Sequence, residues 1–120
     1  VQKSLKGALA SGIPGSVEGM VVAHKKYGKL SWKLLLAPSI ALARDGFKIT
    51  SRQANELNGL KSTLIEQNPN GTALLKAEGD WKEGDVLIQQ ELATTLQLIS
   101  DKGRAGFYEG SVAEKIVSEK

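Results

Sequence analysis

Apolar side chains recur along most of this chain at the three- and four-residue spacing that places them on one face of a helix. In the first such stretch, four residues occupy positions i, i+3, i+4 and i+7: Val17, Met20, Val21 and His24. Ser16 stands where a helix N-cap is favoured, and Gly28 follows as a stop signal. The pattern predicts a helix over residues 16–27, with an inner stripe that includes His24.

A second helix is predicted over residues 31–45, with Ser31 as its N-cap. Five of its residues share one face: Trp32, Leu35, Leu36, Ile40 and Ala43. Gly46 can take the left-handed conformation that ends many helices. Pro38 lies inside the pattern, where its ring removes one backbone hydrogen bond. We therefore expect a kink near residues 34–38, or a break into two short helices.

The third predicted helix begins at a capping box, in which Thr50 and Gln53 each bond to the other's backbone N–H group. Three leucines form its expected buried stripe: Leu57, Leu60 and Leu64. Residues 68–71 read Asn-Pro-Asn-Gly, a dense turn signal, so the helix is expected to end before them. Over residues 72–88 the apolar positions form two short runs separated by Gly-Asp turns, which predicts a small extended or hairpin insert.

A fourth helix is predicted over residues 90–102 and ends at Gly103. Its inner face has three residues: Leu92, Leu96 and Ile99. Ser111 and Glu114 have the spacing of a second capping box, which opens a terminal helix that runs to Lys120. The inner face of this helix has four residues: Val112, Ala113, Ile116 and Val117.

Residues 1–15 are rich in glycine and include a proline, which predicts a turn-rich lead-in. Together the patterns predict a mainly α fold, an orthogonal bundle of about five helices with one small extended insert. A length of 120 residues and a mass of 12.8 kDa fit one hydrophobic core. We therefore treat residues 1–120 as a single helical segment.

Composition narrows the classes of function. The chain has no cysteine, which removes disulfides, thiolate metal sites and cysteine nucleophiles. No apolar run approaches the ~20 residues that span a bilayer, so neither a membrane-spanning segment nor a signal peptide is expected. The net charge of +3 comes from lysines spread along the chain, and aromatic residues are 5%, so no nucleic-acid partner is expected. Because the first residue is Val1, we expect a processed chain or a piece of a larger protein.

His24, the only histidine, is the one candidate for an imidazole base or a Ser-His-Asp triad. It falls in line with Val17 and Val21 on the inner stripe, and no Gly-x-Ser-x-Gly elbow supplies a nucleophile beside it. A packed histidine with one hydrogen-bond partner is the favoured interpretation. Thr94 and Thr95 lie mid-helix, where hydroxyl groups usually bond back to the preceding turn.

The glycines at positions 7 and 12 have the spacing of a phosphate-binding loop. Ile13 and Pro14 follow, however, where such a loop needs Lys and then Ser or Thr to reach the phosphates and the magnesium ion. We therefore expect no nucleotide phosphate to bind here.

Four acidic residues crowd into one polar stretch: Glu78, Asp80, Glu83 and Asp85. Lys82 stands where a calcium loop would need an oxygen ligand, so a solvated turn is favoured over a metal site. Residues 70–72, Asn-Gly-Thr, fit the glycosylation acceptor pattern, although Asn-Gly is itself a preferred turn pair. No catalytic, cofactor-binding or metal-binding residue is predicted in this chain.

Six blocks of the chain carry a resemblance to a known family: residues 10–19, 26–30, 35–47, 82–89, 92–96 and 106–110. They include Gly-Ile-Pro-Gly near the start and Ala-Pro-Ser-Ile-Ala-Leu-Ala around Pro38. In this order they resemble the C-terminal helical part of the large subunit of γ-glutamyltransferases, also called γ-glutamyltranspeptidases.

The resemblance implies a parent enzyme with the four-layer α/β fold of N-terminal-nucleophile hydrolases, made as a zymogen that cuts itself. A threonine that becomes the first residue of the small subunit would attack the γ-glutamyl amide of glutathione or a related compound, and the acyl group would pass to an amino acid, a peptide or water. The arginine that grips the substrate would lie upstream of Gly-Ile-Pro-Gly. Arg44, Arg52 and Arg104 match other blocks, so no catalytic residue is carried over.

The implied partners of this segment are the remainder of the large subunit and the small catalytic subunit of the same precursor. A small γ-glutamyl compound would be the parent's substrate, and no cofactor is implied. The segment itself would be a scaffold without activity. The family is mostly exported, which implies a periplasmic or extracellular location. Two alternatives stay open: a self-contained helical binding module, and an acylase relative that acts on another amide.

Overall fold

The computed structural model describes residue 5 and residues 7–119, and this part of the chain is mainly helical. The described residues form seven α-helices, one short 3-10 helix and one antiparallel sheet of two strands. The chain divides into two compact units, the first formed by Val1–Ile40 with Ala93–Lys120 and the second by Ala41–Leu92. The mainly α class predicted from the sequence is confirmed, and the orthogonal arrangement of the helices stays a prediction.

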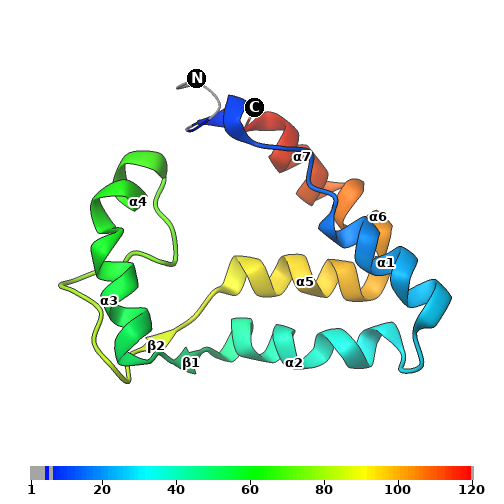
Figure 1. Cartoon of the computed structure of the whole chain (residues 1–120), viewed down its shortest axis with the longest axis horizontal. Helices are drawn as coiled ribbons and strands as arrows, with labels where there is room; N and C mark the ends of the chain where they lie inside the picture. Colours follow the sequence, from blue (N-terminus) through cyan, green and yellow to red (C-terminus); the bar gives the residue numbers. More distant parts are fainter. Residues whose placement is uncertain (1–4, 6, 120) are drawn as a thin grey trace. The chain divides into compact units, whose positions relative to one another are not determined.

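The described residues of the first unit form helices and no strand. Its elements are η2 (Ala8–Ala10), α1 (Ser16–Tyr27), the first part of α2 (Trp32–Asp45), the last part of α5 (Gln90–Lys102), α6 (Arg104–Tyr108) and α7 (Ser111–Ser118). Figure 1 shows α1 beside α6, and the two helices are in contact. The buried cluster joins Val17 and Val21 of α1 to Ile99 of α5. The predicted inner faces of these two helices therefore meet in one core.

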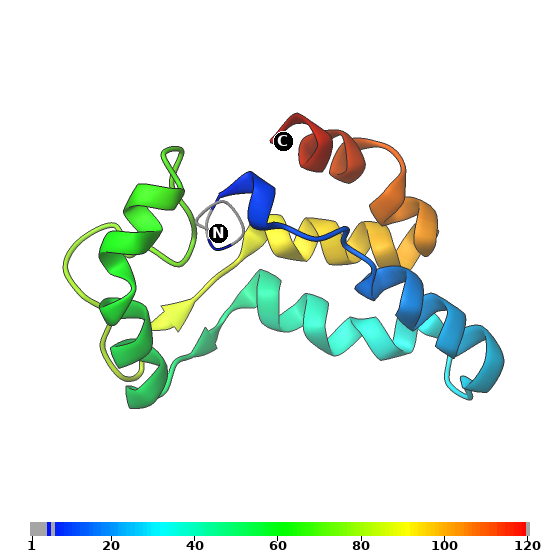
Figure 2. The ribbon, with the colours of Figure 1, turned by 45° about the horizontal axis from the view of Figure 1, so that its top comes forward.

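The second unit contains the small sheet. Its elements are the end of α2, β1 (Phe47–Lys48), α3 (Ser51–Gly59), α4 (Lys61–Gln67), β2 (Val86–Leu87) and the start of α5. The strands are antiparallel and side by side (Figure 2), with Phe47 opposite Leu87 and Lys48 opposite Val86. Ile49 follows β1 and is only 2% exposed, in a cluster with Leu87 and with Ala54 of α3. The sheet is therefore anchored to α3 by apolar packing.

Several local signals in the sequence are confirmed. The Thr50 hydroxyl accepts a hydrogen bond from the Gln53 N–H at 3.1 Å, and the Gln53 side chain accepts one from the Thr50 N–H at 2.9 Å. The Ser31 hydroxyl accepts a bond from the Leu34 N–H at 3.3 Å, as expected for a residue that caps α2. Gly46 has φ +84°, the left-handed conformation expected after that helix. Each of these features depends on at most four neighbouring residues, so the sequence alone was sufficient to predict it.

Two predicted caps are wrong. The N-cap positions of α1 and α7 are Gly15 and Gly110, and neither helix has a side-chain cap of its own. Ser16 and Ser111 are instead the first residues inside these helices. Gly110 has φ +73°, which a serine would adopt only with strain. The helices therefore begin one residue earlier than the capping pattern predicts.

The predicted third helix is divided in two at Leu60. The N–H of this residue is shared between the carbonyl groups of Glu56 and Leu57, at 3.2 Å each, and such a shared bond tightens the turn. The second predicted helix, α2, instead continues through Pro38. Of the two predicted outcomes, the break into two helices is therefore wrong and the kink stays a prediction. A proline removes only one backbone hydrogen bond, and the other backbone hydrogen bonds continue along the 14 residues of α2. The five-residue helix α6 was not predicted.

The insert over residues 72–88 is a loop that ends in β2, and it is not a hairpin. Its first apolar run, residues 73–75, is held in a turn by the Leu75 N–H, which donates to the Thr72 carbonyl at 3.1 Å. The strand partner of β2 is β1, which lies before α3 in the chain. Periodicity inside the insert could not reveal this partner, because it is some forty residues away.

Candidate functional site

His24 is half-buried near the end of α1, as the sequence predicts. Its Nε2 atom lies 2.8 Å from the Leu30 carbonyl oxygen, and its ring centroid lies 5.3 Å from that of Trp32. A Cβ atom at Gly28 would collide with the imidazole, so this position requires glycine. The ring therefore packs within the turn between α1 and α2, and its hydrogen-bond partner is a backbone carbonyl.

Two of the four acidic residues of the insert, Asp80 and Asp85, pair with nearby lysines. Asp85 accepts hydrogen bonds from the Lys76 ammonium at 2.7 Å and from the Lys82 N–H at 2.9 Å. Asp80 forms an ion pair with Lys61 at 3.3 Å. Across residues 5 and 7–119, no group of three or more His, Asp or Glu residues could hold a metal ion. The two aspartates therefore have cationic partners from the same unit, and the preference for a solvated turn stays a prediction.

The three arginines that match family blocks each pair with a nearby carboxylate. Arg44 pairs with Asp45 at 3.0 Å, and its guanidinium hydrogen bond holds the pKa of Asp45 below its usual range. Arg52 pairs with Glu56 one helical turn away in α3 at 3.2 Å. Arg104 pairs with Glu18 of α1. Arg44 and Arg52 use local partners, whereas Arg104 joins two helices of the first unit.

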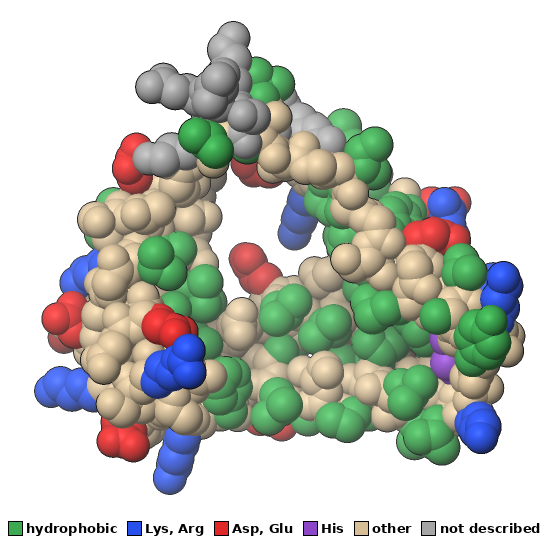
Figure 3. Space-filling view, viewed as in Figure 1, with side chains coloured by type: hydrophobic (Ala, Val, Ile, Leu, Met, Phe, Trp, Pro, Cys, Tyr) green, Lys and Arg blue, Asp and Glu red, His purple; other side chains and the backbone are tan. Residues whose placement is uncertain are grey.

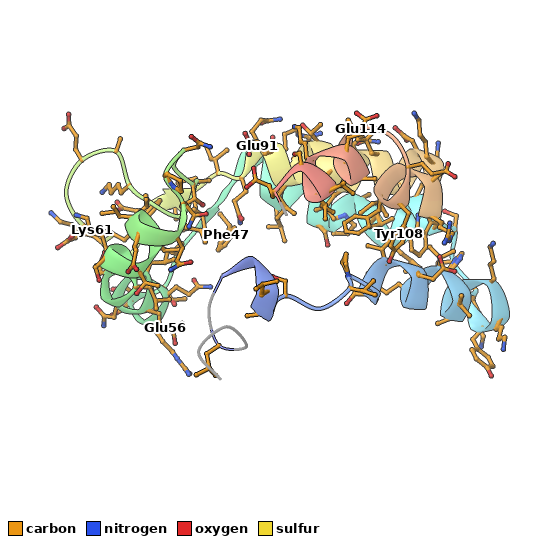
Figure 4. The ribbon with its side chains drawn as sticks, turned by 90° about the horizontal axis from the view of Figure 1, so that it is seen from above. Phe47, Glu56, Lys61, Glu91, Tyr108 and Glu114 are labelled. Carbon is orange, nitrogen blue, oxygen red and sulfur yellow. The ribbon has the colours of Figure 1, made fainter. Side chains whose placement is uncertain are left out.

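Tyr108 supplies the cap that α1 lacks. Its side chain lies between α6 and α1 (Figure 4), where its hydroxyl donates to the Pro14 carbonyl at 2.7 Å and accepts from the Glu18 N–H at 3.1 Å. The Arg104 guanidinium lies 5.1 Å from the Tyr108 ring centroid. One residue thereby satisfies a free N–H in the first turn of α1 from 90 positions away. No local pattern signals such a cap, so sequence reasoning missed it.

Removal of this hydroxyl tests the assignment. In Tyr108→Phe the Glu18 N–H loses its hydrogen-bond acceptor. We therefore expect the first turn of α1 to open more easily, with a free-energy cost that is lower by about 1 kcal/mol. Amide hydrogen exchange of α1 measures the change. Tyr27→Phe is the matched control, since Tyr27 is 80% exposed in the same helix. Equal protection of α1 in the two variants would contradict the role of Tyr108.

Trp81 holds the long loop of the second unit against α3. Its indole N–H donates to the Leu74 carbonyl at 2.9 Å, inside the same loop. The side chain of Asn58 in α3 bonds to both backbone groups of Trp81, with its Nδ2 on the carbonyl and its Oδ1 on the N–H, each at 2.8 Å. The Lys76 ammonium lies 5.9 Å from the Trp81 ring centroid. These contacts give the loop one defined path over α3.

The Lys76–Asp85 pair makes this loop sensitive to acid. The Lys76 ammonium and the Lys82 N–H hold the pKa of Asp85 below its usual range, so the folded loop favours the charged carboxylate. The stabilisation is fully present above the unfolded pKa of about 3.9 and is lost as the pH falls through the lower, folded value. In an acid titration followed by NMR, the chemical shift of the Trp81 indole N–H should change over the pH range in which this stabilisation is lost.

Two variants define the source of the acid sensitivity. Asp85→Asn is expected to remove the low-pH step, because no carboxylate remains to protonate. Glu83→Gln lies in the same turn, is exposed and leaves the step in place. A step of unchanged size in Asp85→Asn would show that another group controls the loop.

Two open hollows are lined by described residues of the second unit alone. The larger, about 620 Å³, lies between the turn before the insert and the start of α5, and half of its lining residues carry amide or hydroxyl side chains, with Glu91 as the one acid. The smaller, about 210 Å³, is apolar and lies between the sheet and α3, beside Phe47 and Leu60. Glu91 is the single carboxylate that lines the larger hollow, and Glu56 is the single one that lines the smaller. Figure 4 labels both side chains. Neither brings together an acid, a base and a nucleophile.

Many apolar side chains of the first unit are exposed. Met20 was predicted to be buried, but it is 54% exposed, and Val117 of α7 is 72% exposed. Leu34 and Leu35 lie at the surface of α2, and hydrophobic side chains follow this helix in the space-filling view (Figure 3). Among the described residues, no helix has the length and apolar character that crossing a membrane requires. These exposed side chains, and not a cluster of titratable groups, are the candidate functional surface.

Comparison with known proteins gives matches over the whole chain. A family model described as gamma-glutamyltranspeptidase matches residues 1–120. The chain is 39% identical over 119 residues to the glutathione hydrolase proenzyme of Escherichia coli (strain K12). The aligned region covers 98% of this chain and 20% of that protein. The chain spans about a fifth of the length of the curated relatives that it matches.

Two solved structures are similar to this one. The gamma-glutamyltranspeptidase of Helicobacter pylori matches with a TM-score of 0.89 and 39% identity, over 96% of this chain and 33% of that chain. The transpeptidase CapD of Bacillus anthracis matches with a TM-score of 0.76 and 36% identity, over 94% of this chain and 39% of that chain. Both sequence and fold therefore point to the same group of proteins.

Proposed function

Because the chain belongs to the gamma-glutamyltranspeptidase family, we propose that the protein carrying it transfers or hydrolyses the γ-glutamyl group of glutathione and related γ-glutamyl compounds. The match of the family model to all of residues 1–120 is the observation that carries the proposal. The reaction is an acyl transfer. A nucleophile outside this chain forms the acyl-enzyme and expels the amine, and an amino acid, a peptide or water then accepts the γ-glutamyl group.

Within that protein we assign this chain the role of a helical scaffold. Its partners would be the remainder of the large subunit and the small catalytic subunit of the same precursor. The number of large apolar side chains exposed in each unit supports the assignment, since apolar surface that a domain does not bury is available to a partner. Leu34 and Leu35 of α2 are exposed in the first unit, and Leu60 and Ile65 are exposed in the second. The arginines and acids described above are instead paired within their own units.

We further propose that the protein is exported to the periplasm or the cell exterior, as the family resemblance implies. Cell fractionation with a cytoplasmic marker enzyme measures this. Recovery of the processed protein with the cytoplasmic marker would refute the proposed location and would leave the proposed activity standing.

The activity is tested on the complete precursor with a chromogenic γ-glutamyl anilide. We expect self-cleavage into two chains and release of the anilide, which a dipeptide acceptor accelerates. The α-glutamyl anilide is the matched control and should not react. An uncut precursor without turnover would refute the proposal. Cleavage of poly-γ-glutamate alone would favour the acylase alternative.

A further inference from the structure

The chain has four asparagines, and they differ in the residue that follows and in their surroundings. Asn55 precedes Glu56, and Asn68 precedes Pro69. Asn58 and Asn70 both precede glycine. The four positions therefore form an internal series for one reaction of asparagine, the attack of the next backbone nitrogen on the side-chain amide.

This reaction has defined requirements. The nitrogen of residue i+1 attacks the asparagine Cγ, the C–N bond of the side-chain amide breaks, and ammonia leaves with the proton from the attacking nitrogen. The resulting five-membered succinimide is opened by water to aspartate or isoaspartate. Glycine at i+1 favours the attack because it has no side chain and the widest choice of backbone angles. Proline blocks it because its nitrogen carries no hydrogen.

Asn70 meets these requirements. It is exposed in the turn that follows α4, and Gly71 has φ +83°, outside any helix or strand. The Gly71 N–H donates one hydrogen bond, to the Asn68 carbonyl at 2.9 Å, within the turn. A single bond in an exposed turn opens at little cost, so the Gly71 nitrogen can reach the Asn70 Cγ.

Asn58 has the same following residue and the opposite surroundings. It lies in α3, and its side chain is half-buried and held at both ends by the backbone of Trp81, at 2.8 Å each. To form the succinimide, Asn58 must release both bonds and the last turn of α3 must open. The fold therefore protects one Asn-Gly pair and exposes the other.

We propose that Asn70 is a site of spontaneous deamidation in the native protein, with water as the only co-reactant, and that Asn58 is protected by the Trp81 contact. The product adds one negative charge to the larger hollow of the second unit, which both Asn70 and Glu91 line. It also abolishes the Asn-Gly-Thr acceptor pattern. The site acts through its own chemistry and does not depend on the proposed enzyme activity.

The test is a time course on the purified native protein in mildly alkaline buffer, followed by acidic digestion and peptide mass spectrometry. We expect Asn70 to convert at least ~10-fold faster than Asn58, because Asn58 reacts only after local opening of α3. In urea the two Asn-Gly sites should react at similar rates. Asn55 and Asn68 are the slow controls in both conditions.

Two variants complete the test. In Asn70→Gln, the modified form should disappear from the native time course while the exchange protection of α3 is unchanged, since residue 70 is exposed. Equal rates at Asn58 and Asn70 in the native protein would overturn the proposal. An Asn70 that stays intact over the time course, or that carries a glycan in the purified protein, would also overturn it. None of these results depends on turnover of a γ-glutamyl substrate.

Discussion

Gly106→Ala is expected to destabilise the first unit by about 3 kcal/mol, at the upper end of the range for overpacking. A Cβ atom at this position would overlap the carbonyl group of Leu98 and lie 2.9 Å from the Ile99 nitrogen, both in α5. These atoms are backbone, so no side-chain rotation relieves the collision. Amide hydrogen exchange of α5 and α6 in the complete protein measures the loss.

Gly19→Ala is the matched control and should change stability in the opposite direction. Gly19 lies within α1, and a Cβ atom there would meet nothing within 4 Å. Alanine in a helix interior is favoured over glycine by roughly 0.5–1 kcal/mol, so α1 should gain protection. Destabilisation in both variants, or in neither, would contradict the close approach of α6 to α5.

Trp81→Ala is expected to destabilise the second unit by about 3 kcal/mol, at the lower end for a large aromatic because the side chain is half-buried. The change removes its packing against the cluster of Ile49, Ala54 and Leu87, and it removes the bond to the Leu74 carbonyl. Hydrogen exchange of α3 and β1 measures the effect.

Trp81→Phe separates packing from hydrogen bonding at the same position. It retains most of the buried ring and loses the indole N–H, so we expect a cost of about 1 kcal/mol. If Trp81→Ala and Trp81→Phe cost the same, the hydrogen bond alone would hold the loop. If neither changes the exchange of α3, Trp81 does not anchor the loop.

The elements that the sequence predicted correctly depend on neighbouring residues. Thr50 and Gln53 form a capping box because both groups lie within one turn. The end of α4 at Gln67 follows directly from the Asn-Pro-Asn-Gly turn. The boundaries of α5, Gln90–Lys102, match the predicted range because leucine spacing and Gly103 mark them locally.

The errors arise where a distant residue decides the local structure. Ser16 has a capping sequence, yet the Tyr108 hydroxyl caps α1 from α6. The insert has strand-like runs, yet β2 pairs with β1 across the whole of α3 and α4. Met20 fits the predicted inner stripe of α1, yet it lies outside the cluster of Val17 and Val21. Spacing alone does not show which apolar positions find a partner.

The functional surface was the hardest part to predict. Motif reasoning looks for convergent titratable groups, and here His24 and Asp85 are engaged in packing and in a local ion pair. Leu35 of α2 was predicted to lie on the inner face, yet it is 48% exposed, because periodicity cannot separate a core face from an interface. The ordered blocks of family resemblance indicated which larger protein this segment would serve.

The most direct test of the scaffold assignment compares the isolated 120-residue chain with the complete protein in the same γ-glutamyl anilide assay. The scaffold assignment predicts turnover by the complete, self-cleaved protein and none by the isolated chain. Anilide release by the isolated chain, or a correctly cleaved complete protein that releases none, would contradict it.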